Sequence, residues 1–121
     1  PPFCCDYGEN IEIGKNVFIN FNCSILSCAK VEIGDDCWIG PNVQIYTAIH
    51  PLEPKKRNTG IGTAKPVKIG KDCWLGGGVI VLPGVEIGEG STIGAGSVVV
   101  KDIPANCVAV GNPCKVVKKI K

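Results

Sequence analysis

An aliphatic residue returns at every sixth position along most of the chain, and this short fixed period constrains the fold more than any other feature of the sequence. The period runs through three blocks of positions: Ile13, Ile19 and Ile25; Ile33, Ile39 and Ile45; and Ile69, Leu75, Val81, Ile87, Ile93 and Val99. A small or β-branched residue stands four positions after the aliphatic residue, as at Val17, Cys23 and Cys37. Helices need apolar residues three and four positions apart, and these segments lack that spacing. The pattern predicts short strands that each turn a large and a compact side chain inward.

Glycine follows many of the aliphatic residues, and we expect the chain to turn there, because glycine adopts conformations that cost other residues more. These positions are Gly14, Gly34, Gly40, Gly70, Gly76, Gly88 and Gly94. Three six-residue sides that close on one another would make a triangular coil, and successive coils would stack through parallel backbone hydrogen bonds. The sequence therefore predicts an all-β fold, a parallel β-helix in the form of a triangular solenoid, as a single domain over residues 1–121.

The rhythm disappears between Ile45 and Ile69, and we expect residues of about 46–66 to protrude from the coil as a loop. This segment contains His50, the one His of the sequence, directly before Pro51. An imidazole is well suited to accept a proton near neutral pH, so His50 is a candidate general base, with an ordinary surface residue as the alternative. The rhythm also breaks at about 104–121, which predicts a cap over the last coil.

The composition of the 121 residues, with 45% hydrophobic residues, 16 Gly and 9 Pro, suits one turn-rich β domain. A net charge of +2 gives no support for a nucleic-acid partner, and no apolar run is long enough to span a membrane. We expect a cytoplasmic protein. Cys23, Cys37 and Cys73 fall at the compact position of the repeat, where a thiol packs as a small apolar group. With one His to supply nitrogen, no metal site is expected.

Four segments in this order point to a family: CDYGENIEIGKNVFINFNCSIL, PNVQIYTAIHPL, KPVKIGKDCWLGGGVIVLPGVEIGEGSTIGAGSVVVKDIP and VAVGNPCKVVKKI. Together they cover nearly the whole chain, which resembles the hexapeptide-repeat acyltransferases, and most of all the bacterial maltose and galactoside O-acetyltransferases. The resemblance implies a left-handed β-helix that uses acetyl-CoA to acetylate a hydroxyl of a sugar or similar small acceptor. It also implies a homotrimer with each site between two subunits.

The resemblance assigns roles to residues of this sequence. His50 would remove the proton from the acceptor hydroxyl, which then attacks acetyl-CoA directly. Asn20 would bind the acceptor, with a turn residue as the alternative because Asn tolerates left-handed backbone conformations. Trp38 follows the compact residue Cys37, so we expect it to face outward and, like most outward tryptophans of a solenoid, to pack against a neighbouring subunit. The residues implied to bind the acetyl-CoA co-substrate are Trp74, Gly76, Gly77, Ala95, Lys101, Lys115 and Lys118. For each of the three lysines, a solvated surface charge is the alternative.

Two departures from the family leave the chemical identity of the acceptor undecided. The resemblance implies a helical segment ahead of the Pro-Pro-Phe start that forms part of the sugar pocket, and an Asp at the strand that holds Ser27 and Cys28 here. Two alternatives therefore stand beside the sugar hypothesis. One is an acetyltransferase acting on an amine or antibiotic acceptor, and the other is a non-catalytic β-helix that lacks the N-terminal acceptor-binding segment.

Overall fold

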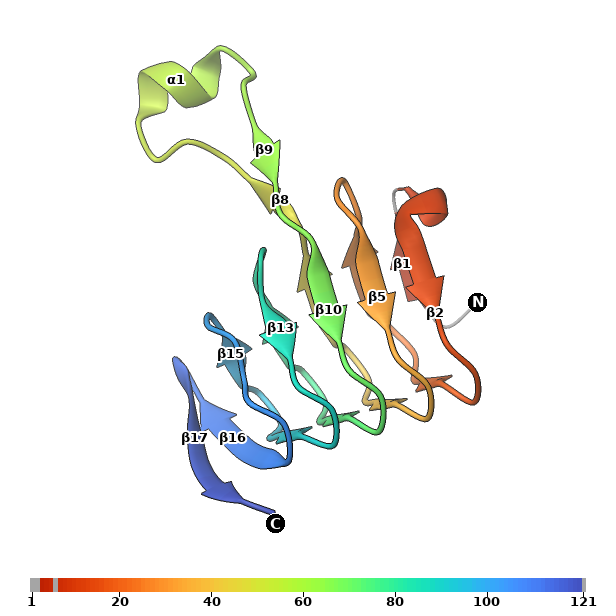
Figure 1. Cartoon of the computed structure of the whole chain (residues 1–121). Helices are drawn as coiled ribbons and strands as arrows, with labels where there is room; N and C mark the ends of the chain where they lie inside the picture. The colour runs from red at the N-terminus through yellow and green to blue at the C-terminus, as the bar shows by residue number, and fades with distance from the viewer. Residues whose placement is uncertain (1–2, 6, 121) are drawn as a thin grey trace.

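The computed structural model describes residues 3–5 and 7–120, and these residues form three sheets that run along one common axis (Figure 1). The ends of the predicted 1–121 domain, at residues 1, 2 and 121, lie outside the described residues. The first sheet contains, in order, β1 (Phe3–Cys5), β4 (Cys23–Leu26), β7 (Gln44–Tyr46), β12 (Ile80–Val81) and β15 (Val98–Val99). The second contains β13 (Glu86–Ile87), β10 (Val67–Ile69), β5 (Val31–Ile33) and β2 (Ile11–Ile13). The third contains β17 (Cys114–Lys119), β16 (Cys107–Gly111), β14 (Thr92–Ile93), β11 (Trp74–Leu75), β6 (Trp38–Ile39) and β3 (Phe18–Ile19).

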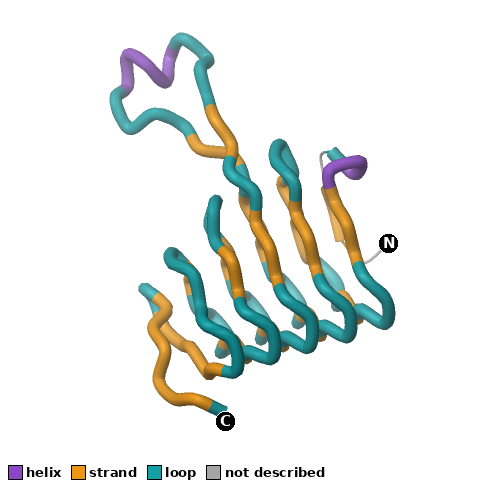
Figure 2. The backbone as a smooth tube through the Cα atoms, in the orientation of Figure 1, coloured by secondary structure: helices purple, strands orange, loops and turns teal. Residues whose placement is uncertain are grey.

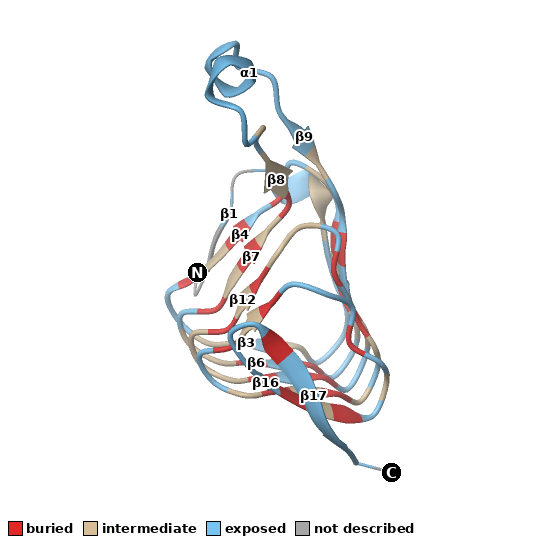
Figure 3. Cartoon of the chain, turned by 90° about the vertical axis from the view of Figure 1, so that its left-hand side faces the viewer, coloured by how far each residue is buried: buried red, intermediate tan, exposed pale blue. Residues whose placement is uncertain are grey.

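The chain visits the three sheets in rotation, so that it winds as a three-sided coil (Figures 2 and 3). After β2 in the second sheet it enters the third at β3 and the first at β4, and β5 returns it to the second. Equivalent residues of successive coils are paired, as Ile13 is with Ile33 and Ile33 with Ile69. The pairing is parallel in all three sheets except between β16 and β17. The predicted β architecture with parallel stacking is confirmed.

The interior of the coil is filled by the aliphatic residues of the six-residue period. Ile39, Leu75 and Ile93 of the third sheet are stacked on adjacent strands and all are buried. Removing a side chain of this size from water stabilises a fold by about 1.5–3 kcal/mol. The repeat thus forms one continuous apolar column along the axis.

The cysteines at the compact position also face the interior, which confirms their predicted packing role. Cys23, Cys37 and Cys73 are buried. Each thiol donates a hydrogen bond to a glycine carbonyl oxygen of the next coil, and the three acceptors are Gly40 at 3.2 Å, Gly70 at 3.1 Å and Gly88 at 3.2 Å. The hydrogen bond with Cys37, and burial after it, raises the pKa of the Cys73 thiol. This thiol therefore stays protonated and acts as a packing and hydrogen-bonding group.

The glycines that follow the aliphatic residues are required by close stacking, so the expectation that they supply unusual backbone conformations is wrong. A Cβ on Gly34 would lie 2.5 Å from the backbone nitrogen of Lys71 in the next coil, and none of these glycines has a positive φ. The left-handed residues stand two positions later, at Asn16, Asn22, Asp36, Asn42, Asp72, Gly78, Gly84, Gly90, Gly96 and Asn106. With coils about 4.8 Å apart, these glycines have no room for a Cβ, while Asn, Asp or Gly suits the position two residues later.

The long loop leaves the coil after β7 and returns at β10, at the corner between the first and second sheets. Its base is an antiparallel pair, β8 (Ala48–Ile49) and β9 (Thr63–Ala64), and its tip holds the short helix α1 (Pro54–Asn58). The backbone N–H of Lys65 donates to the carbonyl of Thr47 at 2.9 Å, which closes the base. Figure 1 shows the loop projecting away from the body of the coil.

The two ends of the described chain are irregular. A short 3-10 helix, η1 (Gly8–Asn10), precedes β2 at the first coil. At the other end, β17 turns back antiparallel beside β16 and forms the edge of the third sheet. No helix in residues 3–5 and 7–120 is long and apolar enough to cross a membrane.

Candidate functional site

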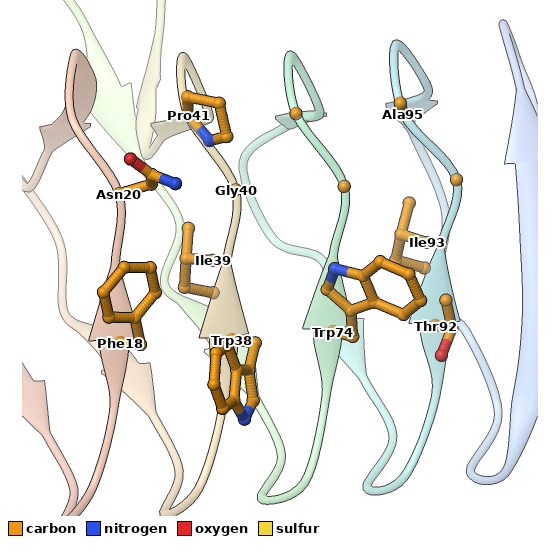
Figure 4. A pocket seen from close by; sticks show the side chains of 13 residues that line it. Phe18, Asn20, Trp38, Ile39, Gly40, Pro41, Trp74, Thr92, Ile93 and Ala95 are labelled. Atoms are coloured by element: carbon orange, nitrogen blue, oxygen red, sulfur yellow. The ribbon is translucent and has the colours of Figure 1, made fainter.

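A groove of about 540 Å³ lies on the outer face of the third sheet (Figure 4). Five of the predicted site residues line it together: Asn20, Trp74, Gly76, Gly77 and Ala95. The remaining lining residues are Phe18, Trp38, Ile39, Gly40, Pro41, Thr92, Ile93 and Gly94. The structure therefore gathers residues from four coils, which the sequence separates by up to 77 positions, from Phe18 to Ala95, onto one face.

Strand register orders this face into two rows that run across all six strands. The aromatic row consists of the outward residues Phe18, Trp38, Trp74, Thr92, Val108 and Lys118. The glycine row consists of the residues two positions after each member of the aromatic row, from β3 to β16, and of the β17 partner of the last one. Its members are Asn20, Gly40, Gly76, Gly94, Val110 and Lys115. At roughly 4.8 Å per strand, the glycine row extends about 24 Å from Asn20 to Lys115. This groove, the channel, runs parallel to the axis across β3, β6, β11 and β14, and the two rows continue past it to β16 and β17.

The floor of the channel is bare backbone over three coils. Gly40, Gly76 and Gly94 carry no side chain. Stacking explains the first two, because a Cβ on Gly76 would lie 2.7 Å from the nitrogen of Ala95, whereas a Cβ on Gly94 would meet the side chain of Val110. Because this row carries no side chains over three coils, an extended ligand can approach its peptide groups closely.

Asn20 stands at one end of the channel with its amide group held in place. Its Oδ1 accepts a hydrogen bond from the backbone N–H of Phe21 at 2.8 Å. The Nδ2 group makes no hydrogen bond within the described residues, and Figure 4 shows the amide beside Gly40 and Pro41. The alternative role of a left-handed turn residue is wrong, since the positive φ belongs to Asn22. Asn20 thus offers the channel an oriented donor.

The two tryptophans point outward, as predicted, with Trp38 60% and Trp74 58% exposed. Phe18 extends the same surface, with its ring centroid 5.5 Å from that of Trp38. An apolar cleft of about 360 Å³ lies between the two indoles. The packing of Trp38 against a neighbouring subunit stays a prediction. Sequence reasoning missed Phe18 and Thr92, although both stand one position before an aliphatic residue of the period, where the side chain must face outward.

The three predicted lysines do not lie together. Lys115 and Lys118 are exposed on β17, at the far end of the glycine and aromatic rows. Lys101 is also exposed, but it follows β15 at the corner between the first and second sheets. Two of the lysines therefore lie on the same face beyond the end of the channel, and the third lies on the corner from which the loop departs.

His50 lies outside the channel. It follows β8 at the base of the loop, where its side chain is exposed. Gly62 is its neighbour across the hairpin, and a Cβ there would lie 3.6 Å from His50 Nδ1. Figure 3 shows the loop at the corner opposite the third sheet. Within one chain, the imidazole and the channel face different directions, so a site that uses both needs two copies.

The position at which the family resemblance implies an Asp lies just after β4 rather than on a strand, and a hydrogen-bond network surrounds Ser27 there. The hydroxyl of Ser27 donates to the carbonyl of Tyr7 at 2.8 Å and accepts from the N–H of Tyr7 at 3.3 Å. The side-chain amide of Asn10 donates to the carbonyl of Ser27 at 2.8 Å. Ser27 therefore ties the first coil together. Among the residues described, no group of three or more His, Cys, Asp and Glu side chains is placed to hold a metal ion.

Comparisons with known proteins agree with this architecture. Residues 66–101 match the family model "Bacterial transferase hexapeptide (six repeats)", and residues 10–47 match "Hexapeptide repeat of succinyl-transferase". A hexapeptide-repeat acetyltransferase from Vibrio cholerae is 40% identical, with a TM-score of 0.98 over 100% of this chain and 69% of that one. A maltose O-acetyltransferase from Clostridium difficile is 58% identical, with a TM-score of 0.97 over 98% of this chain and 64% of that one. A galactoside acetyltransferase solved with coenzyme A is 45% identical, with a TM-score of 0.97 over 100% of this chain and 60% of that one.

A coil built on a six-residue repeat, with a groove along one face, defines a hexapeptide-repeat protein. The chain is also 40% identical to the Vibrio cholerae acetyltransferase over 69% of that chain, which is enough to identify the family. The chain belongs to the hexapeptide-repeat acetyltransferase family. It spans 58% and 61% of the length of two curated yeast relatives, to which it is 54% and 58% identical.

Proposed function

We propose that this chain binds acetyl-CoA along the third sheet and transfers the acetyl group to a hydroxyl of a small acceptor such as a sugar. The channel carries this proposal. It crosses four coils, with a bare floor and an oriented amide donor at Asn20, and two lysines lie beyond its other end on the same face. The Vibrio cholerae enzyme was solved with acetyl coenzyme A and the galactoside acetyltransferase with coenzyme A, which supports the co-substrate.

The features of the channel match the parts of CoA. Lysine ammonium groups suit its phosphates, so Lys115 and Lys118 would hold the nucleotide end. The extended pantetheine arm would lie over the glycine row, beside Gly76 and Ala95. The thioester would then lie near Trp74, towards the Asn20 end. Backbone N–H groups near Gly76 and Gly77 are candidates to stabilise the negative charge that develops on the thioester oxygen.

We propose that His50 reaches this channel from a second copy of the chain. The loop that carries His50 also exposes Leu52, which is 94% exposed, and Ile61, which is 62% exposed. Burial of such side chains in an interface is favourable. Because the loop and the channel lie on opposite sides of the coil, each copy would insert its loop against the next, and such a head-to-tail contact forms a ring when the rotation between copies closes. We propose a threefold ring, a homotrimer of left-handed coils.

The proposed reaction is a direct transfer. His50 takes the proton from the acceptor hydroxyl while the amide of Asn20 positions the acceptor. The hydroxyl oxygen bonds to the thioester carbonyl carbon, the C–S bond breaks, and CoA leaves as a thiolate that takes up a proton. An alcohol is a weak nucleophile at neutral pH, and a positioned base typically contributes about 10²- to 10⁴-fold. We place the reaction in the cytoplasm, where thiols such as the buried cysteines stay reduced.

The test is acetyl-CoA consumption, followed as thiol release, against a panel of sugars with amines as the comparison. Thiol release with sugars and not with amines is the expected result. His50→Gln should lower turnover by about 10²-fold or more without changing the melting temperature, since the side chain is exposed. Lys56→Gln, on the same loop, is the matched control and should keep full activity. Thiol release with amines alone would favour the amine acceptor, and no release with any acceptor would favour a non-catalytic β-helix.

A further inference from the structure

We propose that Thr92 is a specificity-determining residue of this channel, whose hydroxyl holds an amide group of the pantetheine arm. The inference rests on the proposed binding of CoA to the third sheet. It adds a contact that selects pantetheine thioesters over simple thioesters without amide groups.

The position of Thr92 places its side chain in the middle of the channel. Thr92 lies on β14 and is the strand partner of Trp74, one step nearer to the lysines of β17. It lines the groove and is half-buried, and Figure 4 shows it beside the indole of Trp74. In the proposed orientation of CoA, this point lies between the thioester and the phosphates, where the arm carries its amides.

The hydroxyl of Thr92 differs from those of its neighbours because it has no hydrogen-bond partner within residues 3–5 and 7–120. The adjacent hydroxyl of Ser91 donates to the carbonyl of Pro104 at 2.6 Å, and that of Ser97 donates to the carbonyl of Gly94 at 2.6 Å. Thr47, at the corner of the first sheet, donates to the carbonyl of Leu26 at 2.7 Å. These inward hydroxyls stabilise the fold through hydrogen bonds to backbone carbonyl groups. The outward hydroxyl of Thr92 is left for a ligand.

The channel offers few hydrogen-bonding side chains besides this hydroxyl. The lining is otherwise apolar or bare backbone, apart from the amide of Asn20 and the indole N–H groups. An amide that enters an apolar groove without a partner loses its hydrogen bonds to water, which is unfavourable. A threonine hydroxyl can donate to an amide carbonyl or accept from an amide N–H, so Thr92 suits either half of the group.

The test compares Thr92→Val with Thr92→Ser by calorimetric titration of two ligands, CoA and adenosine 3′,5′-bisphosphate, which lacks the arm. Valine keeps the β-branched shape that suits a strand and removes the hydroxyl. Loss of one neutral hydrogen bond should weaken CoA binding about 3- to 10-fold, with the bisphosphate unaffected. Thr92→Ser should restore binding to within about 2-fold of the original. In turnover, KM for acetyl-CoA should rise by the same factor with kcat unchanged.

Ser24→Ala, on β4 of the first sheet, serves as the control for loss of a hydroxyl away from the channel. Unchanged CoA affinity in Thr92→Val would overturn the role of Thr92 and leave the proposed function standing. Equal weakening of CoA and the bisphosphate would also overturn it, because the sheet itself would then be disturbed. Failure of the unaltered chain to bind CoA would overturn the proposed function, and the Thr92 contact with it.

Discussion

Replacing Gly34 with alanine tests whether close stacking of the coils determines the glycine positions. The added Cβ would lie 2.5 Å from the backbone nitrogen of Lys71 and 2.8 Å from the carbonyl carbon of Gly70. An ordinary contact needs about 3.5 Å, so the two coils would have to separate locally by roughly 1 Å. The hydrogen bond from the N–H of Gly34 to the carbonyl of Ile69, now 2.8 Å, would then exceed about 3.5 Å and be lost. Overpacking and the lost bond together predict a free energy of unfolding lower by about 2–4 kcal/mol.

Urea denaturation followed by circular dichroism measures this change. Gly8→Ala is the matched control, because a Cβ there meets only the Sγ of Cys5 at 3.8 Å, and its free energy of unfolding should change by less than about 0.5 kcal/mol. Gly34 lies on the second sheet, away from the channel, so the comparison reports on stacking alone. If Gly34→Ala unfolded at the same urea concentration as the original chain, the stacking argument would be refuted.

Three further predictions concern the channel, the core and a surface ion pair. Ala95→Leu places a larger side chain in the channel at an exposed position and should raise KM for acetyl-CoA about 10-fold or more with an unchanged melting temperature. Leu75→Ala empties a site in the central column and should lower the free energy of unfolding by about 2–5 kcal/mol in urea. Lys30, whose Nζ lies 2.9 Å from a carboxylate oxygen of Glu32, lowers the pKa of that carboxyl through a hydrogen bond and its charge. Lys30→Gln should therefore raise the pKa of Glu32 in an NMR titration. Because the pKa is lowered in the folded state, any stabilisation is present at neutral pH and disappears as the pH falls through that pKa.

The fold followed from the sequence because one physical constraint acts at every coil. Each coil must bury one large and one compact side chain at fixed positions, so Ile39 and Cys37 already predict the interior of the third sheet. The reason why glycine is required at these positions could not be predicted from the sequence, because the distance between coils is a property of the stacked structure. The register that aligns Gly34 with Gly70 depends on residues 36 positions apart.

The candidate site followed from the sequence only in part. The family resemblance placed Asn20, Trp74 and Ala95 in one site, and the structure brings these three to a single groove. Spacing alone did not predict that Lys101 and Lys115 lie on different sides of the coil. The side depends on which of the three sheets the chain has reached at each residue, and the six-residue rhythm is already broken there. Thr92 was missed because an outward threonine on a strand is unremarkable until its hydroxyl is seen to have no partner in the part of the chain that the structure describes.

The central claim is that CoA occupies the third sheet, and a crystal structure of this chain with CoA tests it most directly. The account predicts the pantetheine arm over Gly40, Gly76 and Gly94, the phosphates beside Lys115 and Lys118, and His50 of a neighbouring copy near the thiol. Density for CoA on the first or second sheet, or a thiol end remote from every imidazole, would contradict it.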